Sequence, residues 1–500
     1  MRRKNKLISR DVFYIVLIIL FAFILRFPYL QLPLERDEGG YAYVGWLWTS
    51  GRGIPYLSVF DHKPPIPFLI SGLASLLAGN NFYSVRILSM AYFLILILTS
   101  FYFFLMITGR KVALLSTVLM IVYLSSIRLE GSYFNIEMQM IFPLLVYCFA
   151  IYWLSQKNAR KRLIIAFIAG LSVFFAVFLK QVAVFPVAGL GLWLLTKNKK
   201  VKEILLMALG FFIPTLIVIL YFGYQGAFDE AFRDLVVYNR GYTQEGLKPE
   251  NIFIAGQAKG LLGYFNWITK MPPAILPLFL FSIAGLIFLR KQKSPAWWVS
   301  LILIVTLWVG IKTGGSREFP HYYLGLVLGL SFAFLFIADK MVKKKRKGLL
   351  GIVFVILIFW VVIPEFKLWL GKSVAIQEKQ FGIQGSWFYT APLVSEWIKE
   401  NTKSNDTLLV WANEPEIYFY SGKIAPGGFM HFYGFYHLPG EKEKWLGYLS
   451  ANPPDWIVTY KDDPGTYAEL MDFLANKPFS YEFIRDTGYF FVLKKNEFKN

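Results

Sequence analysis

The feature that most constrains this sequence is a series of long apolar runs, which are separated by short clusters of basic residues. Many of these runs approach about twenty residues, the length that a helix needs to cross the hydrocarbon core of a bilayer. Of the 500 residues, 56% are hydrophobic and only 17% are charged, whereas about a quarter of the residues in a soluble domain are charged. The sequence therefore predicts a polytopic α-helical membrane protein.

A net charge of +20 could indicate nucleic-acid binding, so the positions of the basic residues matter. These residues lie in short clusters between the apolar runs: MRRKNK, GRK, QKNARKR, KNKKVK, RKQK and KMVKKKRK. Cytoplasmic loops of membrane proteins carry such an excess of Lys and Arg. We therefore expect the lipid bilayer, and no nucleic acid, as a partner.

The basic clusters also predict how the chain crosses the membrane. If each cluster is cytoplasmic, the N-terminus lies inside and the apolar runs form about eleven spans. The first run is too long for a signal-peptide core and lacks a cleavage site after it, so it is predicted to be a span. A stretch of about 34 residues between QKNARKR and KNKKVK has basic flanks on both sides, which predicts a hairpin of two short spans turning outside near Lys180 and Gln181. The other predicted spans lie near residues 12–30, 82–107, 112–128, 138–155, 203–222, 273–289, 296–311, 322–338 and 349–370.

After residue 370 the composition changes. The runs TLLVWA, DWIVTY and YFFVLKK are typical of strands, and PLVSEWIKEN and TYAELMDFLANK are typical of helices. We predict a small extracytoplasmic α/β domain at 371–500, following a transmembrane domain at 1–370 with outer loops at 31–81 and 224–270. The only cysteine, Cys148, lies in an apolar run, so the chain can form no internal disulfide.

The predicted topology brings charged residues from several loops to the outer face of the membrane. Such a cluster suits the transfer of a sugar from a lipid phosphate, because the lipid tail keeps the phosphate at the membrane surface. A carboxylate can accept the proton of the attacking hydroxyl, and cations can offset the charge that develops on the leaving phosphate. The clustered residues are Arg36, Asp37, Glu38, Asp61, His62, Lys63, Glu137, Lys180, Arg317 and His321.

An acidic pair directly after the first span, a Tyr soon after it, and KPP in the same loop resemble the GT-C glycosyltransferases. The sequence is most similar to the superfamily of protein O-mannosyltransferases (dolichyl-phosphate-mannose-protein mannosyltransferases) and lipid A aminoarabinose transferases. The resemblance covers nearly the whole chain and implies a GT-C fold. It also implies an inverting transfer of a sugar from a polyprenyl-phosphate donor to an extracytoplasmic glycolipid, polysaccharide or protein.

The same resemblance implies roles for individual residues. It makes Asp37 the catalytic base with Glu38 beside it, and it places Lys63 and Lys180 on the donor phosphate. Arg317 and His321 fall where such enzymes often bind phosphate, although this correspondence is looser. The chain has DHKPP in the first loop, so His62 is an added candidate, and Glu137 and Tyr41 are expected to support the site.

Each of these residues also has an ordinary structural interpretation. Asp37 could simply offset Arg36, Glu38 could be a solvated charge, Lys63 could extend to the membrane surface, and Lys180 could contact lipid headgroups. The remaining candidates have comparable alternatives. Glu137 could complement a helix dipole, Tyr41 could be an interface aromatic, and Arg317 and His321 could be loop charges.

Two further stretches stay open between function and structure. The polar loop 224–270 suits either a lid or a plain connection. The aromatic stretch PGGFMHFYGFYHLPG suits sugar rings, membrane contact or a domain core.

No cofactor is predicted, because no His/Cys cluster exists and the closest resemblance is to members thought not to need a metal. Asp37, Glu38 and Glu137 could nevertheless hold a divalent ion, as in the metal-dependent oligosaccharyltransferase branch. The alternative functions are a transporter or flippase of a lipid-linked sugar, and a membrane receptor. Charges at one surface and the lack of an inverted repeat favour the enzyme. The expected location is the plasma membrane, with the active site outside.

Overall fold

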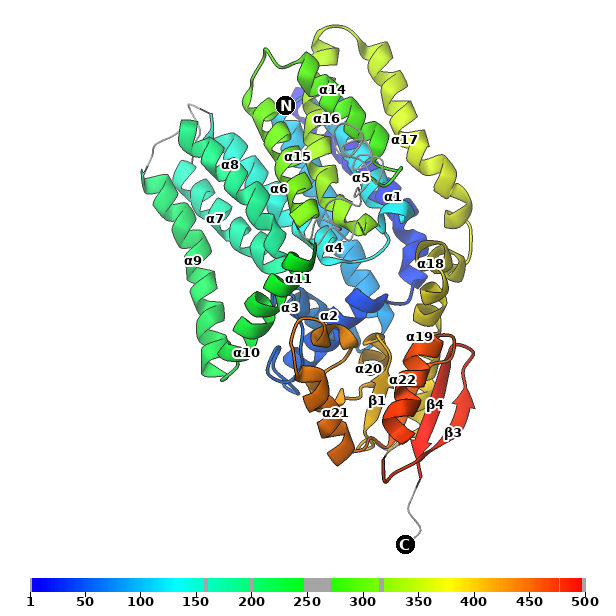
Figure 1. Cartoon of the computed structure of the whole chain (residues 1–500). Helices are drawn as coiled ribbons and strands as arrows, with labels where there is room; N and C mark the ends of the chain where they lie inside the picture. Colours follow the sequence, from blue (N-terminus) through cyan, green and yellow to red (C-terminus); the bar gives the residue numbers. More distant parts are fainter. Residues whose placement is uncertain are drawn as a thin grey trace, which may run out of the picture. The chain divides into compact units, whose positions relative to one another are not determined.

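The computed structural model forms two compact units, each assembled from segments that are far apart in the sequence (Figure 1). Unit 1 consists of Met1–Tyr29, Ser89–Val218 and Thr243–Leu370, and unit 2 of Leu30–Leu88, Ile219–Tyr242 and Gly371–Asn500. Unit 2 thus combines the predicted first outer loop with the predicted C-terminal domain. The structure describes residues 2–156, 161–197, 201–246, 271–313, 319–475 and 477–496.

Helices make up the described part of unit 1, some of them continuing into the segments of unit 2. The hairpin predicted near Lys180 is present, because α7 ends at Leu179, Lys180 has an extended backbone, and a short 3-10 turn leads into α8. The bounds are α1 Arg2–Arg26, η1 Phe27–Gln31, α4 Phe82–Ile107, α5 Arg110–Leu124, η2 Ile127–Leu129, α6 Ile136–Leu154, α7 Arg162–Leu179, η3 Gln181–Ala183, α8 Val184–Lys197, α9 Val201–Tyr224, α14 Leu276–Phe288, α15 Pro295–Thr313, η5 Pro320–Tyr323, α16 Leu324–Lys343 and α17 Lys347–Trp369.

Within the described ranges, eight helical segments are long and apolar enough to cross a membrane. Two shorter apolar helices, Gln181–Lys197 and Leu276–Phe288, and the 15-residue α5 occupy the positions of the remaining predicted spans. Each predicted span therefore corresponds to a helix, and the chain is an integral, multi-pass membrane protein. The eight segments are Val12–Gln31, Phe82–Ile107, Ile136–Leu154, Arg162–Leu179, Val201–Tyr224, Pro295–Thr313, Pro320–Lys343 and Lys347–Trp369.

The core of unit 1 is built around α16, which contacts α5, α6, α14 and α15. Its residues from Leu324 to Ala338 are all buried, as expected for a helix that is apolar on every face. Gly329 allows the approach of α15, because a Cβ at this position would lie 3.1 Å from the Leu303 side chain and 3.2 Å from that of Ile304. Small residues of this kind let membrane helices pack closely.

Unit 2 contains a pair of helices from the predicted first outer loop, α2 (Arg36–Thr49) and α3 (Ile66–Ala78). They cross at two glycines that face each other. A Cβ at Gly45 would lie 2.2 Å from the Phe68 carbonyl oxygen, and a Cβ at Gly72 would lie 2.4 Å from that of Gly45. The described part of the predicted 224–270 loop is helical, with α10 Phe228–Phe232, the π-helix η4 Arg233–Tyr238 and α11 Asn239–Gly246.

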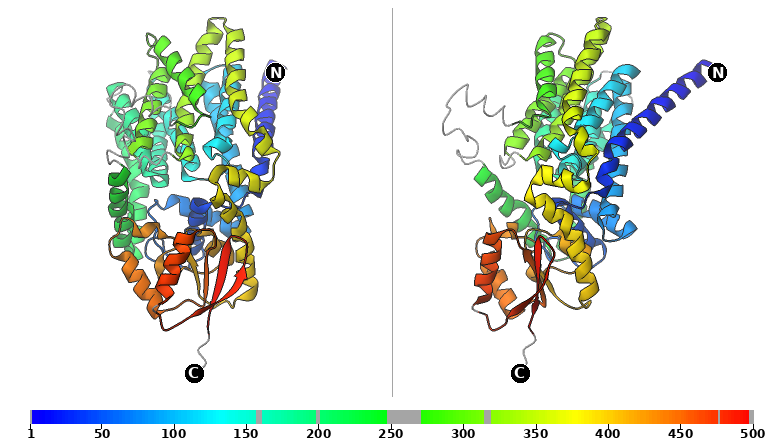
Figure 2. Two further views of the ribbon diagram at one scale, coloured as in Figure 1. Left: turned by 45° about the vertical axis from the view of Figure 1, so that its right-hand side comes forward. Right: turned by 90° about the vertical axis from the view of Figure 1, so that its right-hand side faces the viewer.

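The C-terminal part of unit 2 is an α/β fold with a four-stranded sheet in the order β1-β2-β4-β3. Strands β1 and β2 are parallel, and the other pairs are antiparallel. Figure 2 shows α21 and α22 on one face of the sheet and α19 on the other. The bounds are α18 Ser373–Phe381, α19 Ile383–Asn401, β1 Leu408–Trp411, α20 Glu416–Ser421, η6 Pro426–Gly428, η7 Phe432–Phe435, α21 Glu441–Ala451, β2 Trp456–Tyr460, α22 Pro464–Ala475, β3 Tyr481–Asp486 and β4 Phe490–Lys495.

The aromatic stretch of the C-terminal part belongs to the core of unit 2. Phe429, Phe432 and Phe435 pack in one hydrophobic cluster with Trp411 and Trp445, whose rings stack with centroids 5.5 Å apart. Of the three interpretations of this stretch, the structure supports a domain core for these phenylalanines. The predicted strands are present as β1, β2 and β4, whereas β3 was not predicted.

Candidate functional site

The acidic stretch of the predicted first outer loop forms the first turn of α2 in unit 2. Glu35 is the N-cap, and its carboxylate accepts hydrogen bonds from the backbone N–H groups of Asp37 and Glu38, both at 3.0 Å. The Glu38 carboxylate accepts the Glu35 N–H in return at 3.2 Å, which completes a capping box. Burial, together with the carboxylates of Asp37 and Glu38, raises the pKa of Glu35 well above its usual range. Glu35 therefore has a structural task in starting the helix.

Glu38 forms a buried ion pair with Arg86, an arginine that was not predicted to be a site residue. Its carboxylate receives two hydrogen bonds from Arg86, at 2.5 and 2.7 Å, and both side chains are buried. Arg86 also donates to the carbonyls of Leu32 and Pro33. A signal for this arginine does exist in the sequence, since a lone Arg inside an apolar run requires a partner.

Arg36, in the same turn of α2, is hydrogen-bonded to the C-terminal part of unit 2. Arg36 Nε donates to the Asn413 carbonyl at 2.6 Å, and its Nη2 donates to the Glu414 carboxylate at 3.1 Å. The hydroxyl of Tyr460 donates to the same Glu414 oxygen at 2.5 Å. Glu416 packs directly against the turn, because a Cβ at Gly39 would lie 2.6 Å from its Cβ.

Asp37 lies in the sequence between Arg36, which binds Glu414, and Glu38, which binds Arg86. Its side chain is half-buried. No hydrogen bond or ion pair of its carboxylate is found among the residues that the structure describes. The charged or titratable groups that interact with it electrostatically include Glu35, Asp61 and His431. Within this turn, two carboxylates are committed to structure, and Asp37 has one that can accept a proton.

The DHK segment of the predicted first outer loop lies in the same unit. Asp61 is 4% exposed, and its carboxylate accepts the backbone N–H of Lys63 at 2.9 Å. Burial raises the pKa of Asp61 to about 7, although the Lys63 charge opposes this shift. The Lys63 carbonyl accepts the Tyr56 hydroxyl at 2.8 Å, so the backbone that carries this lysine is held on both sides. Asp61 was not predicted as a site residue.

His62 packs among aromatic rings. Its ring centroid lies 4.8 Å from that of Tyr238 and 5.7 Å from that of Tyr242, and its carbonyl accepts the Asn239 side chain at 2.8 Å. Tyr238 ends the π-helix η4, a type of helix that is frequent at functional sites. Tyr41 is 2% exposed and lies near the Phe68 ring, so it is a core residue of unit 2.

His431, from the aromatic stretch, interacts electrostatically with Asp37. Its ring meets the Phe60 ring edge-on at 6.3 Å, and it is buried. Burial lowers the pKa of His431 to about 4, against the effect of the Asp37 carboxylate. The imidazole is therefore neutral at physiological pH.

A separate group of charged residues occupies unit 1. Lys180, at the turn between α7 and η3, forms an ion pair with Glu137 in the first turn of α6, and its ammonium group lies 4.0 Å from the Tyr322 ring centroid. His321 contacts Glu130 through Nδ1, and its Nε2 lies 3.7 Å from the Glu137 carboxylate. In this group each carboxylate faces at least one basic side chain.

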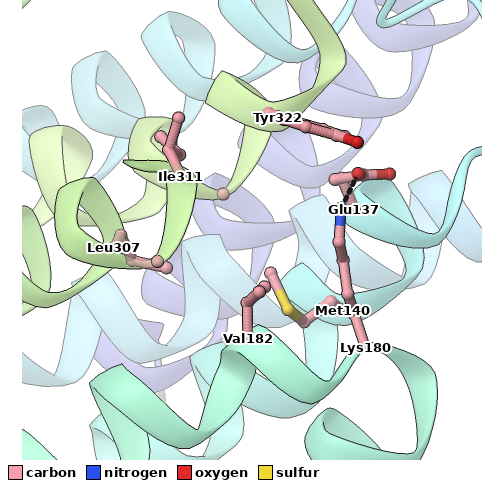
Figure 3. Close-up of a pocket in the computed structure, with 9 residues that line it drawn as sticks. Glu137, Met140, Lys180, Val182, Leu307, Ile311 and Tyr322 are labelled. Atoms are coloured by element: carbon pink, nitrogen blue, oxygen red, sulfur yellow. Dashed lines mark hydrogen bonds and ion pairs between the residues drawn. The ribbon is translucent and has the colours of Figure 1, made fainter. Parts of the chain in front are cut away.

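A pocket of unit 1 has these charges at one end and an apolar lining at the other. Figure 3 shows Glu137, Lys180 and Tyr322 together, with the side chains of Leu307 and Ile311 across the pocket. Such a pocket can accept a polar group attached to an apolar one. The full lining is Glu137, Met140, Lys180, Val182, Leu307, Gly310, Ile311, Tyr322 and Gly325.

Two solved structures resemble the whole chain. Both are crystal structures of ArnT from Cupriavidus metallidurans, one bound to undecaprenyl phosphate and one in the apo state. In each case the TM-score is 0.63 at 12% sequence identity, and the match covers 97% of this chain and 98% of the other. The chain has the GT-C fold. No protein-family model matches the sequence, and the search of curated proteins finds no match.

On this GT-C fold, the predicted site residues fall into two groups. Unit 2 holds Asp37, Glu38, Tyr41, His62 and Lys63, and unit 1 holds Glu137, Lys180 and His321. The predicted phosphate contact Arg317 lies outside the described residues. In the part of the chain that the structure describes, no three His, Cys, Asp or Glu side chains are grouped to hold a metal ion.

Proposed function

We propose that this protein is a membrane glycosyltransferase that moves a sugar from a polyprenyl-phosphate donor to an extracytoplasmic acceptor, with inversion. The observation that carries the proposal is the Asp37 carboxylate, which is uncommitted although the turn around it is tied on both sides. The GT-C fold supports it, because the ArnT structure with the same fold contains a bound undecaprenyl phosphate. The acceptor is a glycolipid, a polysaccharide or a protein.

In the proposed reaction, Asp37 accepts the proton of the acceptor hydroxyl while its oxygen bonds to the anomeric carbon of the sugar. The bond between that carbon and the phosphate oxygen breaks, and polyprenyl phosphate leaves with the electron pair. Lys63 offsets the charge on the leaving phosphate. Because attack and departure occur on opposite faces of the sugar, a single displacement inverts the anomeric carbon.

The other residues have lesser proposed roles. Lys180, His321 and Arg317 are proposed to contribute to phosphate binding. For Lys180 this contribution requires the phosphate to compete with Glu137, its partner in the ion pair. Glu38 is proposed to support Asp37 through the turn, and Glu137, His62 and Tyr41 to support the site through packing or pairing.

The proposed sidedness follows from the basic clusters, which place the C-terminal α/β part and the active site outside the plasma membrane. A reporter enzyme fused after Asn500 is expected to be active outside, and one inserted after Lys347 to be active inside. A reporter at Asn500 that is active only in the cytoplasm would remove the C-terminal part from the proposed acceptor side.

The decisive experiment is donor turnover by the purified protein. We expect the protein, supplied with an envelope extract as acceptor source, to release free polyprenyl phosphate from one of a panel of polyprenyl phosphates carrying labelled sugars. The Asp37→Asn variant is the matched control, since it keeps the shape of the side chain and loses the base. Movement of an intact donor across a liposome membrane, with no release in either assay, would instead identify a flippase.

A further inference from the structure

We infer that Glu414, in the C-terminal α/β part of the chain, is a positioning residue for Asp37. The inference rests on the proposed function, since it concerns the orientation of the proposed base. It assigns to the C-terminal part a task in the chemistry, in addition to any contact with an acceptor. All the residues involved belong to unit 2.

The contact begins at Arg36, the first residue of α2. Its guanidinium is fixed by two acceptors on the segment after β1, the Asn413 carbonyl at 2.6 Å and the Glu414 carboxylate at 3.1 Å. Glu414 is fully buried, and the Tyr460 hydroxyl on β2 fixes the same carboxylate oxygen at 2.5 Å. The position of Arg36 is therefore set by two neighbouring strands of the sheet.

Helix geometry passes this constraint to Asp37. Successive residues of an α-helix are rotated by about 100°, so Arg36, Asp37 and Glu38 leave the turn in different directions. Arg36 is held by Glu414, and Glu38 is held by two hydrogen bonds from Arg86 at 2.5 and 2.7 Å. With the residues on either side held, the backbone of Asp37 and the direction of its Cα–Cβ bond are set as well, and its carboxylate stays available.

The charges at this contact also suggest more than a stabilising role. Burial raises the pKa of Glu416 well above its usual range, and the nearby Glu414 carboxylate adds to this shift. Glu414 is the carboxylate that Arg36 binds, through Nη2 at 3.1 Å. A buried ion pair often stabilises a fold no better than apolar residues of the same size, although some such pairs specify one geometry. Here the geometry specified is that of the α2 turn.

The test compares Glu414→Gln with a control in the same α/β part. Gln keeps an oxygen for Tyr460 and Arg36 but loses the charge. We expect Glu414→Gln to lower kcat about ten-fold at saturating donor while donor affinity stays unchanged. The control is Asp455→Asn, which weakens hydrogen bonds from Thr407 and an ion pair with Lys495. These contacts lie at the opposite ends of β1 and β2 from Glu414 and Tyr460. Asp455→Asn should lower the melting temperature of the protein without lowering kcat.

A double variant separates positioning from general damage. If Glu414 acts through Asp37, Glu414→Gln should cause no further loss in an Asp37→Asn background, whereas a purely structural role predicts the same ten-fold loss in both backgrounds. If Glu414→Gln does not fold, Tyr460→Phe offers a milder change. It removes the hydroxyl that donates to Glu414 and accepts the Asn413 N–H, both on the segment that holds Arg36. We expect kcat to fall about two- to five-fold with the same coupling.

The outcomes distinguish this inference from the function on which it rests. Normal turnover by both Glu414→Gln and Tyr460→Phe, in an enzyme that depends on Asp37, would overturn the inference and leave the proposed function intact. A wild-type protein that binds the donor without releasing polyprenyl phosphate would overturn both.

Discussion

The charged group of unit 1 and the acidic turn of unit 2 differ in how completely their charges are paired. In unit 1, Glu137 pairs with Lys180 and Glu130 contacts His321. In the α2 turn, Glu35 caps the helix and Glu38 binds Arg86, whereas the carboxylate of Asp37 takes part in neither arrangement. In the charged group of unit 1, both carboxylates are paired with basic side chains. In the acidic turn of unit 2, the carboxylate of Asp37 is not committed to a hydrogen bond or ion pair among the described residues.

The difference indicates which residues are ready to act in the resting protein. Partners within the protein reduce the cost of placing charges among apolar helices, but they also compete with any ligand. A phosphate that approaches Lys180 has to displace Glu137 or share the lysine with it. Asp37 can accept a proton without losing a hydrogen bond, so it is the stronger candidate for direct chemistry.

Replacing Asp37 should produce the largest loss of turnover, and it tests the one carboxylate of the α2 turn that is not committed to structure. Asp37→Asn is expected to leave expression and donor binding nearly intact, because the cap and both ties of the turn remain. Turnover at saturating donor should fall about 10²–10⁴-fold, since the base is lost. Donor binding measured in parallel shows that the site is still formed. Near-normal turnover would exclude Asp37 as the base.

Replacing Glu38 breaks its buried ion pair with Arg86 in the same turn. Glu38→Gln leaves the Arg86 charge buried without its carboxylate, which is expected to cost about 3–5 kcal/mol of stability. Thermal unfolding in detergent measures this loss, and turnover per folded molecule should fall less than in Asp37→Asn. A larger loss of turnover than in Asp37→Asn, at unchanged stability, would move the role of base to Glu38.

Donor affinity tests the paired charges of unit 1, Lys180 and Glu137. Lys180→Ala is expected to weaken donor binding about ten-fold, as for the loss of one charge-assisted hydrogen bond. Glu137→Gln is the matched variant, and it should leave donor binding unchanged or tighten it, since it keeps the lysine charge and removes the competing carboxylate. Lys63→Ala, measured in the same way, tests the proposed phosphate contact of unit 2. Unchanged donor affinity in both lysine variants would remove them from the phosphate site.

The smallest expected effect concerns pH. The pKa of Asp61 rises from 3.8 to about 7 on burial, so between these values the folded protein holds a proton that the unfolded chain releases. Stability therefore falls as the pH rises through this range. Asp61→Asn cannot ionise, so between pH 5 and pH 8 it should lose about 1–3 kcal/mol less stability than the wild type. An equal loss in both proteins would place the titrating group elsewhere, with the buried Asp234 as the next candidate.

The sequence predicted the helices well because apolar length and basic flanks are local signals. The turn at Lys180, the α/β composition after residue 370 and three of the four strands followed from the same kind of pattern. Strand β3 was not predicted because its residues are mostly exposed and include charges, so it lacks the buried apolar run of its neighbours.

The pairs that define the candidate site could not be predicted in this way. Glu38 and Arg86 are 48 positions apart, and Arg36 and Glu414 are 378 apart, so no local pattern joins them. Asp61 was counted among the charged residues of the predicted outer face but was given no role, because its sequence neighbours do not reveal that the structure buries it. The sequence could nominate Asp37, but only the contacts of its neighbours set it apart from Glu35 and Glu38.

The glycine crossing of α2 and α3 limits how this protein can change by mutation. At Gly45 and Gly72 any side chain would overlap backbone atoms of the facing helix, and backbone cannot rotate away as a side chain can. In a saturation library these two positions should be among the least tolerant of the first outer loop. Laboratory evolution towards a new donor or acceptor would then have to proceed through the side chains around Asp37, because a larger residue at this crossing would have to push apart the helix that carries it and α3.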